Sequence, residues 1–305
     1  MTLPLAPVAL FVYRRTRHLT KTLDRLERCD GFSQSPVFIF SDGPRPGAEA
    51  DVAAVRSLVA ARKTPNMTVI ESAANLGLAN SIIAGVGQLC DRFGRVIVIE
   101  DDLLASPALL TWFNRALENY ADAAQVWQVS AHQFAVPAFR RRQSGMFLNF
   151  ATSWGWATWK RAWDQFDTEA HGWQSLAQDA GLRARFDFGG AYPYADMLER
   201  QMAGEVDSWA VRWWWSMFRA GALGLFPPRS MVTNIGEDDT ATHAPSRLGR
   251  LLRPLHTVMD TAPTFPPTVT LDAAAQSAIQ DFLRTRARKF QWARGAWNSL
   301  RGAVT

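Results

Sequence analysis

Three consecutive carboxylates, Glu100, Asp101 and Asp102, directly follow the apolar run at residues 95–99. Buried side by side, such groups repel one another unless a cation or hydrogen-bond donors compensate their charge. Mg²⁺ and Mn²⁺ take one or two carboxylates from a protein and their other ligands from water and substrate phosphates. The triplet therefore predicts a divalent cation site that works together with a phosphate-bearing ligand.

A structural role for the same acids is the alternative. Ser106 and Pro107 are typical of a helix start, and acidic residues near such a start can cap the helix. The triplet ends four residues before Ser106, which is too early for a cap. This spacing favours the cation site over the helix cap.

The elements around the triplet repeat one unit, a β-rich run followed by a stretch with helical spacing. Such repeats indicate parallel strands joined by crossover helices, and therefore an α/β fold with a mostly parallel central sheet. The predicted strands are residues 7–13, 36–40, 67–70 and 95–99, and the predicted helices are residues 16–26, 48–62 and 81–93. Sheets of this kind bind ligands at the carboxyl ends of their strands.

Polar residues follow each of the first three predicted strands. They are Arg14 and Arg15 after the first strand, Asp42 after the second and Asn75 after the third. Each also has a plain structural interpretation, because the arginines could be a solvated helix start, and Asp42 and Asn75 could form turns. Together with the triplet, they are the candidate ligand-binding residues of the sheet.

The sequence around the triplet also resembles a known family. Residues 98–107, Val-Ile-Glu-Asp-Asp-Leu-Leu-Ala-Ser-Pro, are similar to the Glu-Asp-Asp-Leu stretch of the N-acetylglucosaminyltransferase I family and of related bacterial sugar transferases. These are metal-dependent glycosyltransferases with the Rossmann-like GT-A fold. The resemblance covers about residues 6–245, so we predict a GT-A domain at 1–245 and a linker with a C-terminal helix at 246–305.

The resemblance implies a role for each candidate. Asp102 would bind Mn²⁺ or Mg²⁺, and the other two carboxylates of the triplet would face the ribose and the donor sugar. Arg14 or Arg15 would lie near the nucleotide, and Asp42 near its base. The donor implied is a UDP-sugar such as UDP-N-acetylhexosamine, and the acceptor is a hydroxyl of a glycan or glycolipid.

Transfer with inversion needs a general base opposite the leaving diphosphate. The family carries an Asp beside a Trp at this position, which points to Asp207, with Glu205 in reserve. The match is partial, since this sequence has Asp-Ser-Trp where the family tends to have paired acids before the Trp. The alternative is that both acids cap the helix that follows.

Two further candidates come from the second half of the chain. Trp154, beside Gly155 in a region that resembles the donor pocket of the family, could stack on a sugar, although Trp clusters more often form core. His243 ends a polar segment, residues 234–243, that could close over the donor and reach the metal or diphosphate. An ordinary surface loop is the alternative for this segment.

Charge is concentrated at the C-terminal end. Residues 245–305 hold nine Lys or Arg against three acids, so the rest of the chain is close to neutral. This disfavours a nucleic-acid-binding body, which needs basic residues across its fold. Residues 279–301 form a basic amphipathic pattern, which predicts either docking on an anionic membrane surface or packing against the body or another subunit.

Cysteine content and the N-terminus predict a cytoplasmic protein that could sit on the inner face of a membrane. Cys29 and Cys90 are too few for a disulfide framework, and residues 3–13 lack the flanks of a signal peptide. Two rival functions stay open. A nucleotidyltransferase would need a Gly-rich phosphate loop after the first strand, where residues 13–17 contain no glycine, and a non-catalytic sugar-binding protein would keep the fold without turnover.

Overall fold

The computed structural model describes residues 4–236 and 258–302, and side chains up to Arg288 in the last helix. His243 and most of the predicted lid lie outside the described residues. The predictions for that segment therefore stay predictions.

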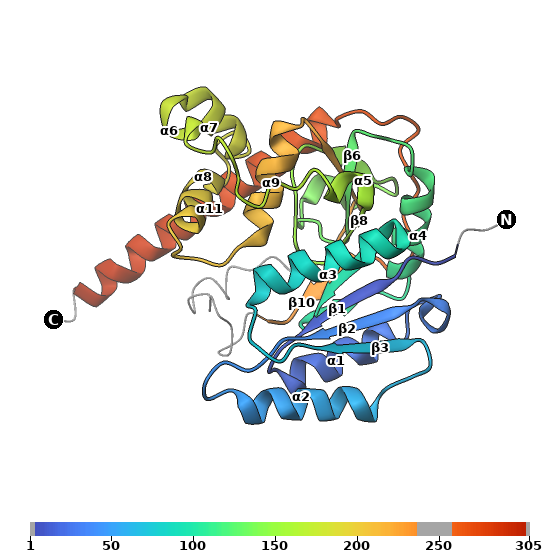
Figure 1. Cartoon of the computed structure of the whole chain (residues 1–305). Helices are drawn as coiled ribbons and strands as arrows, with labels where there is room; N and C mark the ends of the chain where they lie inside the picture. Colours follow the sequence, from blue (N-terminus) through green and yellow to red (C-terminus); the bar gives the residue numbers. More distant parts are fainter. Residues whose placement is uncertain (1–3, 237–257, 303–305) are drawn as a thin grey trace.

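The described chain folds around an eight-stranded sheet of order β3-β2-β1-β4-β8-β6-β9-β7 (Figure 1). Only β8 and β7 run antiparallel to the other strands, which confirms the predicted α/β fold with a mostly parallel sheet. The strands are β1 (Val8–Val12), β2 (Val37–Ser41), β3 (Met67–Glu71), β4 (Arg95–Glu100), β6 (Val126–Ser130), β7 (Met146–Leu148), β8 (Trp156–Trp159) and β9 (Leu223–Phe226).

Helices cover both faces of this sheet. Alternate residues of β1 divide between the two hydrophobic clusters, with Leu10 on one face and Phe11 on the other. The face of Leu10 carries α1 (Thr16–Leu26), α2 (Glu49–Ala61) and α4 (Leu109–Asn119), and the face of Phe11 carries α3 (Leu78–Phe93), α5 (Lys160–Trp163) and α9 (Trp209–Arg219). Figure 1 shows α1 and α2 on the side of the sheet opposite α3.

The first half follows the predicted pattern closely, and α1 has the predicted bounds. Helix α3 starts three residues earlier than predicted, at Leu78. Two carboxylates explain the difference, because Asp42 accepts from the amide of Gly77 at 3.0 Å and Asp207 accepts from the amide of Ala79 at 3.4 Å. Distant side chains thus satisfy the amides that open this helix.

The tryptophan-rich second half is mainly core. Trp213, Trp214 and Trp215 are each at most 2% exposed, and the indole of Trp213 donates to Gln128 at 2.8 Å. This confirms the structural alternative for most of the cluster. The remaining short helices here and elsewhere are α6 (Ser175–Gln178), α7 (Ala180–Phe186), α8 (Tyr194–Met202), η1 (Phe32–Gln34) and η2 (Pro137–Phe139).

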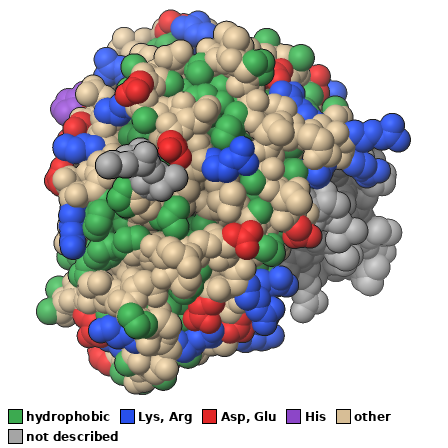
Figure 2. Space-filling view, turned by 90° about the vertical axis from the view of Figure 1, so that its right-hand side faces the viewer, with side chains coloured by type: hydrophobic (Ala, Val, Ile, Leu, Met, Phe, Trp, Pro, Cys, Tyr) green, Lys and Arg blue, Asp and Glu red, His purple; other side chains and the backbone are tan. Residues whose placement is uncertain are grey.

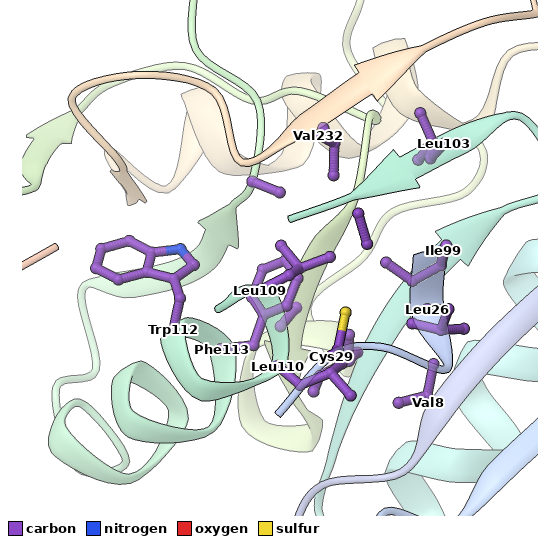
Figure 3. Packing of buried hydrophobic residues seen from close by; sticks show 14 of the residues in the cluster. Val8, Leu26, Cys29, Ile99, Leu103, Leu109, Leu110, Trp112, Phe113 and Val232 are labelled. Carbon is purple, nitrogen blue, oxygen red and sulfur yellow. The ribbon is translucent and has the colours of Figure 1, made fainter. Parts of the chain in front are cut away.

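A two-stranded antiparallel ribbon lies beside the triplet and was not predicted. It pairs β5 (Leu103–Ala105) with β10 (Val232–Asn234), and Asn234 lies opposite Leu103. Val232 and Leu103 belong to the same hydrophobic cluster as Ile99, as Figure 3 shows. Three-residue strands are too short to show a periodic pattern in sequence.

The C-terminal helix α11 (Ala273–Gly302) begins as part of the body. Ala275, Ile279 and Leu283, spaced one helical turn apart, are buried in the cluster that also contains α9. The first half of the predicted tail therefore packs against the body, which was one of the two alternatives. Side chains beyond Arg288 are outside the described part, and membrane docking stays a prediction.

The cysteines, the surface charge and the membrane-spanning potential of the helices can also be described. Cys29 and Cys90 are buried free thiols, and burial raises the pKa of each to about 12. Acidic and basic side chains are mixed over the face shown in Figure 2. Among the described helices, none is long and apolar enough to cross a membrane.

Candidate functional site

The carboxylate triplet lies at the carboxyl end of β4, the edge where such sheets bind ligands. The Asp101 side chain is 6% exposed and that of Asp102 is 13% exposed, while Glu100 is half-buried. The chain continues directly into β5, and α4 begins only at Leu109. The acids are therefore not a cap for that helix.

Arg15 is the counter-ion of the triplet. One guanidinium nitrogen, Nη2, lies 2.6 Å from Asp101 Oδ1 and 2.7 Å from Asp102 Oδ2. Burial alone would lower the pKa of Arg15, but the two carboxylates outweigh burial and raise it. Arg14 is exposed, with its guanidinium 6.0 Å from the ring centre of Tyr13, so of the two predicted arginines only Arg15 contacts the triplet.

One guanidinium does not compensate three carboxylates. Burial, followed by the charges of Asp102 and Asp101, raises the pKa of Glu100 to about 8. Burial also raises the pKa of Asp101, although Arg15 opposes that shift. The site therefore still favours additional positive charge, which is the property expected of a cation site.

The chain by itself supplies few ligands for such a cation. Within the described ranges, no group of three or more His, Cys, Asp or Glu could hold a metal ion. A divalent cation at Asp102 would complete its shell with water and substrate phosphates, as Mg²⁺ usually does. The residues thus fit a cation that is shared with a bound ligand, and not a closed structural metal site.

The backbone after β10 covers the carboxylate of Asp102. The amide of Ile235 donates to the carbonyl oxygen of Asp102 at 2.9 Å, and Arg15 Nη1 lies 3.5 Å from the carbonyl oxygen of Gly236. A Cβ atom on Gly236 would lie 1.9 Å from Asp102 Oδ2. Only glycine therefore fits here without moving the carboxylate.

A small cavity of about 180 Å³ adjoins this cover. The described residues that line it are Arg17, His18, Lys21 and Ile235, so three of the four are basic in type. His18 Nε2 lies 3.2 Å from the carbonyl oxygen of Ile235, and since a carbonyl only accepts, this nitrogen donates. The basic side chains suit a site whose ligand carries phosphates.

A second polar cluster forms at the ends of β2 and β3. Asp42 accepts from the backbone amides of Gly43, Leu76 and Gly77 at 2.8 to 3.0 Å, and from the Asn75 side chain at 3.0 Å. The Asn75 oxygen in turn accepts from Arg45 Nε at 3.0 Å. The two predicted nucleotide contacts are thus brought together in one loop network, and their roles toward a nucleotide stay predictions.

Asp207, which comes much later in the sequence than Asp42 and Asn75, also lies at this second cluster. Its carboxylate lies at the start of α3, 3.4 Å from the Ala79 amide, and the side chain is exposed to solvent. Glu205 is also exposed but pairs with Arg200 at 3.1 Å. The structure therefore brings Asp207, and not Glu205, to the edge that carries Asp42.

Trp154 lies two residues before the start of β8, the strand that pairs with β4. Trp156, the first residue of β8, lies opposite Val98 of β4, and Gly155, with a φ of +68°, turns the chain between Trp154 and this strand. Trp154 is partly buried, and its ring meets that of His132 at 4.6 Å between centres. The indole of Trp154 is therefore only partly covered, and its role toward a donor sugar stays a prediction.

Tyr13 connects the triplet with the second cluster. Its backbone amide lies 3.4 Å from Asp101 Oδ2, and its hydroxyl accepts from the Arg45 amide at 3.1 Å. Tyr13, Gly236 and His18 were not singled out from the sequence, because their contributions are backbone contacts or contacts with distant residues. Through Tyr13 and Arg45, the triplet is thus linked to the cluster that contains Asp42 and Asn75.

Comparisons with known proteins give distant structural likenesses only. No protein-family model and no curated protein matches the chain. Among solved structures, a mannosyltransferase from Pyrobaculum calidifontis, PcManGT, in complex with GDP-Man and Mn²⁺, is 13% identical over 96% of this chain and 76% of that chain, with a TM-score of 0.41. Residues 1–349 of TarS from S. aureus are 12% identical over 74% of this chain and 59% of that chain, with a TM-score of 0.40. What this chain does must therefore be inferred from its own residues.

Proposed function

We propose that the chain is a metal-dependent glycosyltransferase of the GT-A kind that uses a nucleotide-sugar donor. The observation that carries this proposal is the largely buried triplet at the carboxyl end of β4, whose three carboxylates share one close counter-ion among the described residues, Arg15. A site that attracts a cation but supplies few ligands suits a donor whose diphosphate completes the coordination.

Each residue of the edge has a role in this proposal. Asp102 would hold Mn²⁺ or Mg²⁺, which supplies stabilisation of the negative charge on the departing nucleoside diphosphate. Glu100 and Asp101 would face the donor sugar and ribose, and Trp154 the sugar ring. Asp207 would take the proton from the attacking acceptor hydroxyl, and the solvent exposure of its side chain leaves room for that hydroxyl.

The donor and acceptor are proposed from the sequence resemblance. A UDP-sugar, with UDP-N-acetylhexosamine as the first candidate, would lie with its base near Asp42 and Asn75. A hydroxyl of a glycan or glycolipid would attack with inversion at the anomeric carbon, since a base at Asp207 activates the acceptor directly. His243, outside the described residues, would close over the diphosphate.

Thermal unfolding with a panel of nucleotide sugars tests this function. A UDP-sugar in hundredfold excess over its dissociation constant should stabilise the protein by about 2.7 kcal/mol when Mn²⁺ is present. EDTA should remove the stabilisation, because the diphosphate then has no cation to share. Stabilisation by another nucleotide sugar would change only the identity of the donor. Stabilisation that is the same with and without EDTA would contradict the metal-dependent mechanism.

Gly236→Ala should weaken Mn²⁺ binding in the presence of UDP by about ten- to a hundredfold. The added methyl must displace the Asp102 carboxylate, since the two would otherwise be 1.9 Å apart. Gly87→Ala, in α3, is the matched control. A Cβ at this position would have the indole nitrogen of Trp163 as its nearest neighbour, at 3.8 Å, which is an ordinary van der Waals contact. Titration calorimetry would measure both variants, and equal Mn²⁺ affinity in the two would show that Gly236 does not fix the carboxylate.

A further inference from the structure

The guanidinium of Arg15 places a positive charge between Asp101 and Asp102. A single nitrogen of Arg15 lies 2.6 Å from one carboxylate and 2.7 Å from the other. A divalent ion that bridged or approached these two oxygens would have to enter the space of that nitrogen. Arg15 and the metal therefore compete for the same place.

The competition has an energetic consequence. The Arg15 side chain is 22% exposed, and its only other polar contact among the described residues is the Gly236 carbonyl oxygen at 3.5 Å. Displaced from the carboxylates, a partly buried guanidinium loses two close ion pairs and gains little. A metal ion alone must overcome this loss before it can bind.

A nucleoside diphosphate removes the obstacle. Its phosphate oxygens offer the guanidinium a new anionic partner, and the planar fork of arginine suits phosphate geometry. The same phosphates complete the coordination of the cation. The diphosphate thus favours both the departure of Arg15 from the carboxylates and the binding of the cation.

We propose that Arg15 is the resident counter-ion of the cation site, and that it is exchanged for the divalent cation only when a nucleoside diphosphate binds. This inference rests on the proposed function and adds the order and coupling of ligand binding. Metal ion alone binds weakly, and nucleotide and metal strengthen each other's binding through the movement of one side chain. The reciprocity follows from thermodynamic linkage.

The test is to measure Mn²⁺ binding by the full chain, with and without UDP. The electron paramagnetic resonance signal of the free ion reports how much Mn²⁺ is bound. In the wild type, UDP should tighten Mn²⁺ binding by at least about thirtyfold, within the usual range of coupling between sites. In Arg15→Met, Mn²⁺ alone should bind at least about tenfold more tightly than in the wild type, and the effect of UDP should be about tenfold smaller than in the wild type, because only the coupling through shared coordination remains. Arg25→Met removes the same charge from the exposed last turn of α1 and should behave as the wild type.

The direction of the change separates this role from a merely structural one. If Arg15 only held the carboxylates in place, Arg15→Met would weaken the binding of Mn²⁺ alone, and that result would overturn the inference. Undiminished coupling in Arg15→Met would overturn it as well. A wild type that binds UDP and Mn²⁺ independently also contradicts the exchange but leaves the proposed function standing, whereas a wild type that binds neither ligand removes the proposed function itself.

A second variant covers the case in which Arg15→Met does not fold. Arg15→Lys keeps the charge, but a single ammonium on a flexible stem replaces the planar fork. It should fold as the wild type does and show a coupling between Mn²⁺ and UDP that is several-fold smaller. Full wild-type coupling in Arg15→Lys, with a melting temperature equal to that of the wild type, would count against a specific exchange by arginine.

Discussion

Asp102→Asn should abolish sugar transfer while the protein stays folded. The asparagine keeps the shape of the side chain but loses the charge that would hold the cation, and we expect transfer to fall at least a thousandfold, equivalent to about 4 kcal/mol. The fold should survive because Arg15 retains its contact with Asp101 at 2.6 Å. Steady-state assays with the donor identified by thermal unfolding, together with circular dichroism, measure both effects.

Asp51→Asn is the control for that substitution. Asp51 lies exposed in the first turn of α2, so its loss removes one negative charge without touching the triplet. It should leave transfer unchanged. Transfer by Asp102→Asn at the rate of the control would remove Asp102 from the reaction and end the metal assignment.

Asp207→Asn should separate binding from catalysis. If Asp207 takes the proton from the acceptor, its loss should lower kcat by about a hundred- to ten-thousandfold. The affinity for donor and Mn²⁺ should stay within about threefold of the wild type, because Asp207 contacts the start of α3 and not the triplet. Kinetics of the variant and calorimetric titration of the donor give the two quantities.

Glu205→Gln discriminates between the two predicted bases. Glu205 pairs with Arg200 on the surface, and both side chains are about 60% exposed, so the substitution should change kcat less than threefold. A large loss in Glu205→Gln with little effect in Asp207→Asn would exchange their roles. Equal small effects in both would point to a mechanism without a carboxylate base at this position.

Much of the fold could be predicted from the sequence because the first half alternates apolar runs with helical spacing. The four predicted strands and the helix at 16–26 match the structure closely, since each pattern is long enough to read, and β1 and β4 are buried on both faces. The ribbon of β5 and β10 was missed because three residues carry no readable period. The start of α3 was missed because its opening amides bind carboxylates of distant residues.

The site was predictable to a smaller extent. Adjacent carboxylates after a buried strand identify the triplet, and positions at strand ends identify Asp42 and Asn75. Sequence could not choose between Arg14 and Arg15, because the choice depends on which side chain turns toward residues 86 positions away. The fit of Gly236 against Asp102 depends on packing after folding and leaves no signal in residue type alone.

The cover at Gly236 also bears on how the protein reaches its working form. Arg15 and Gly236 are 221 positions apart, yet both border the Asp102 carboxylate. Closing such a long loop is entropically costly and slow compared with local contacts. When β9 has left the ribosome, the triplet, Arg15 and Asp207 have already been synthesised, but Gly236, which covers Asp102, has not. The nascent chain therefore completes its candidate site in a late step, when most of the polypeptide is already made.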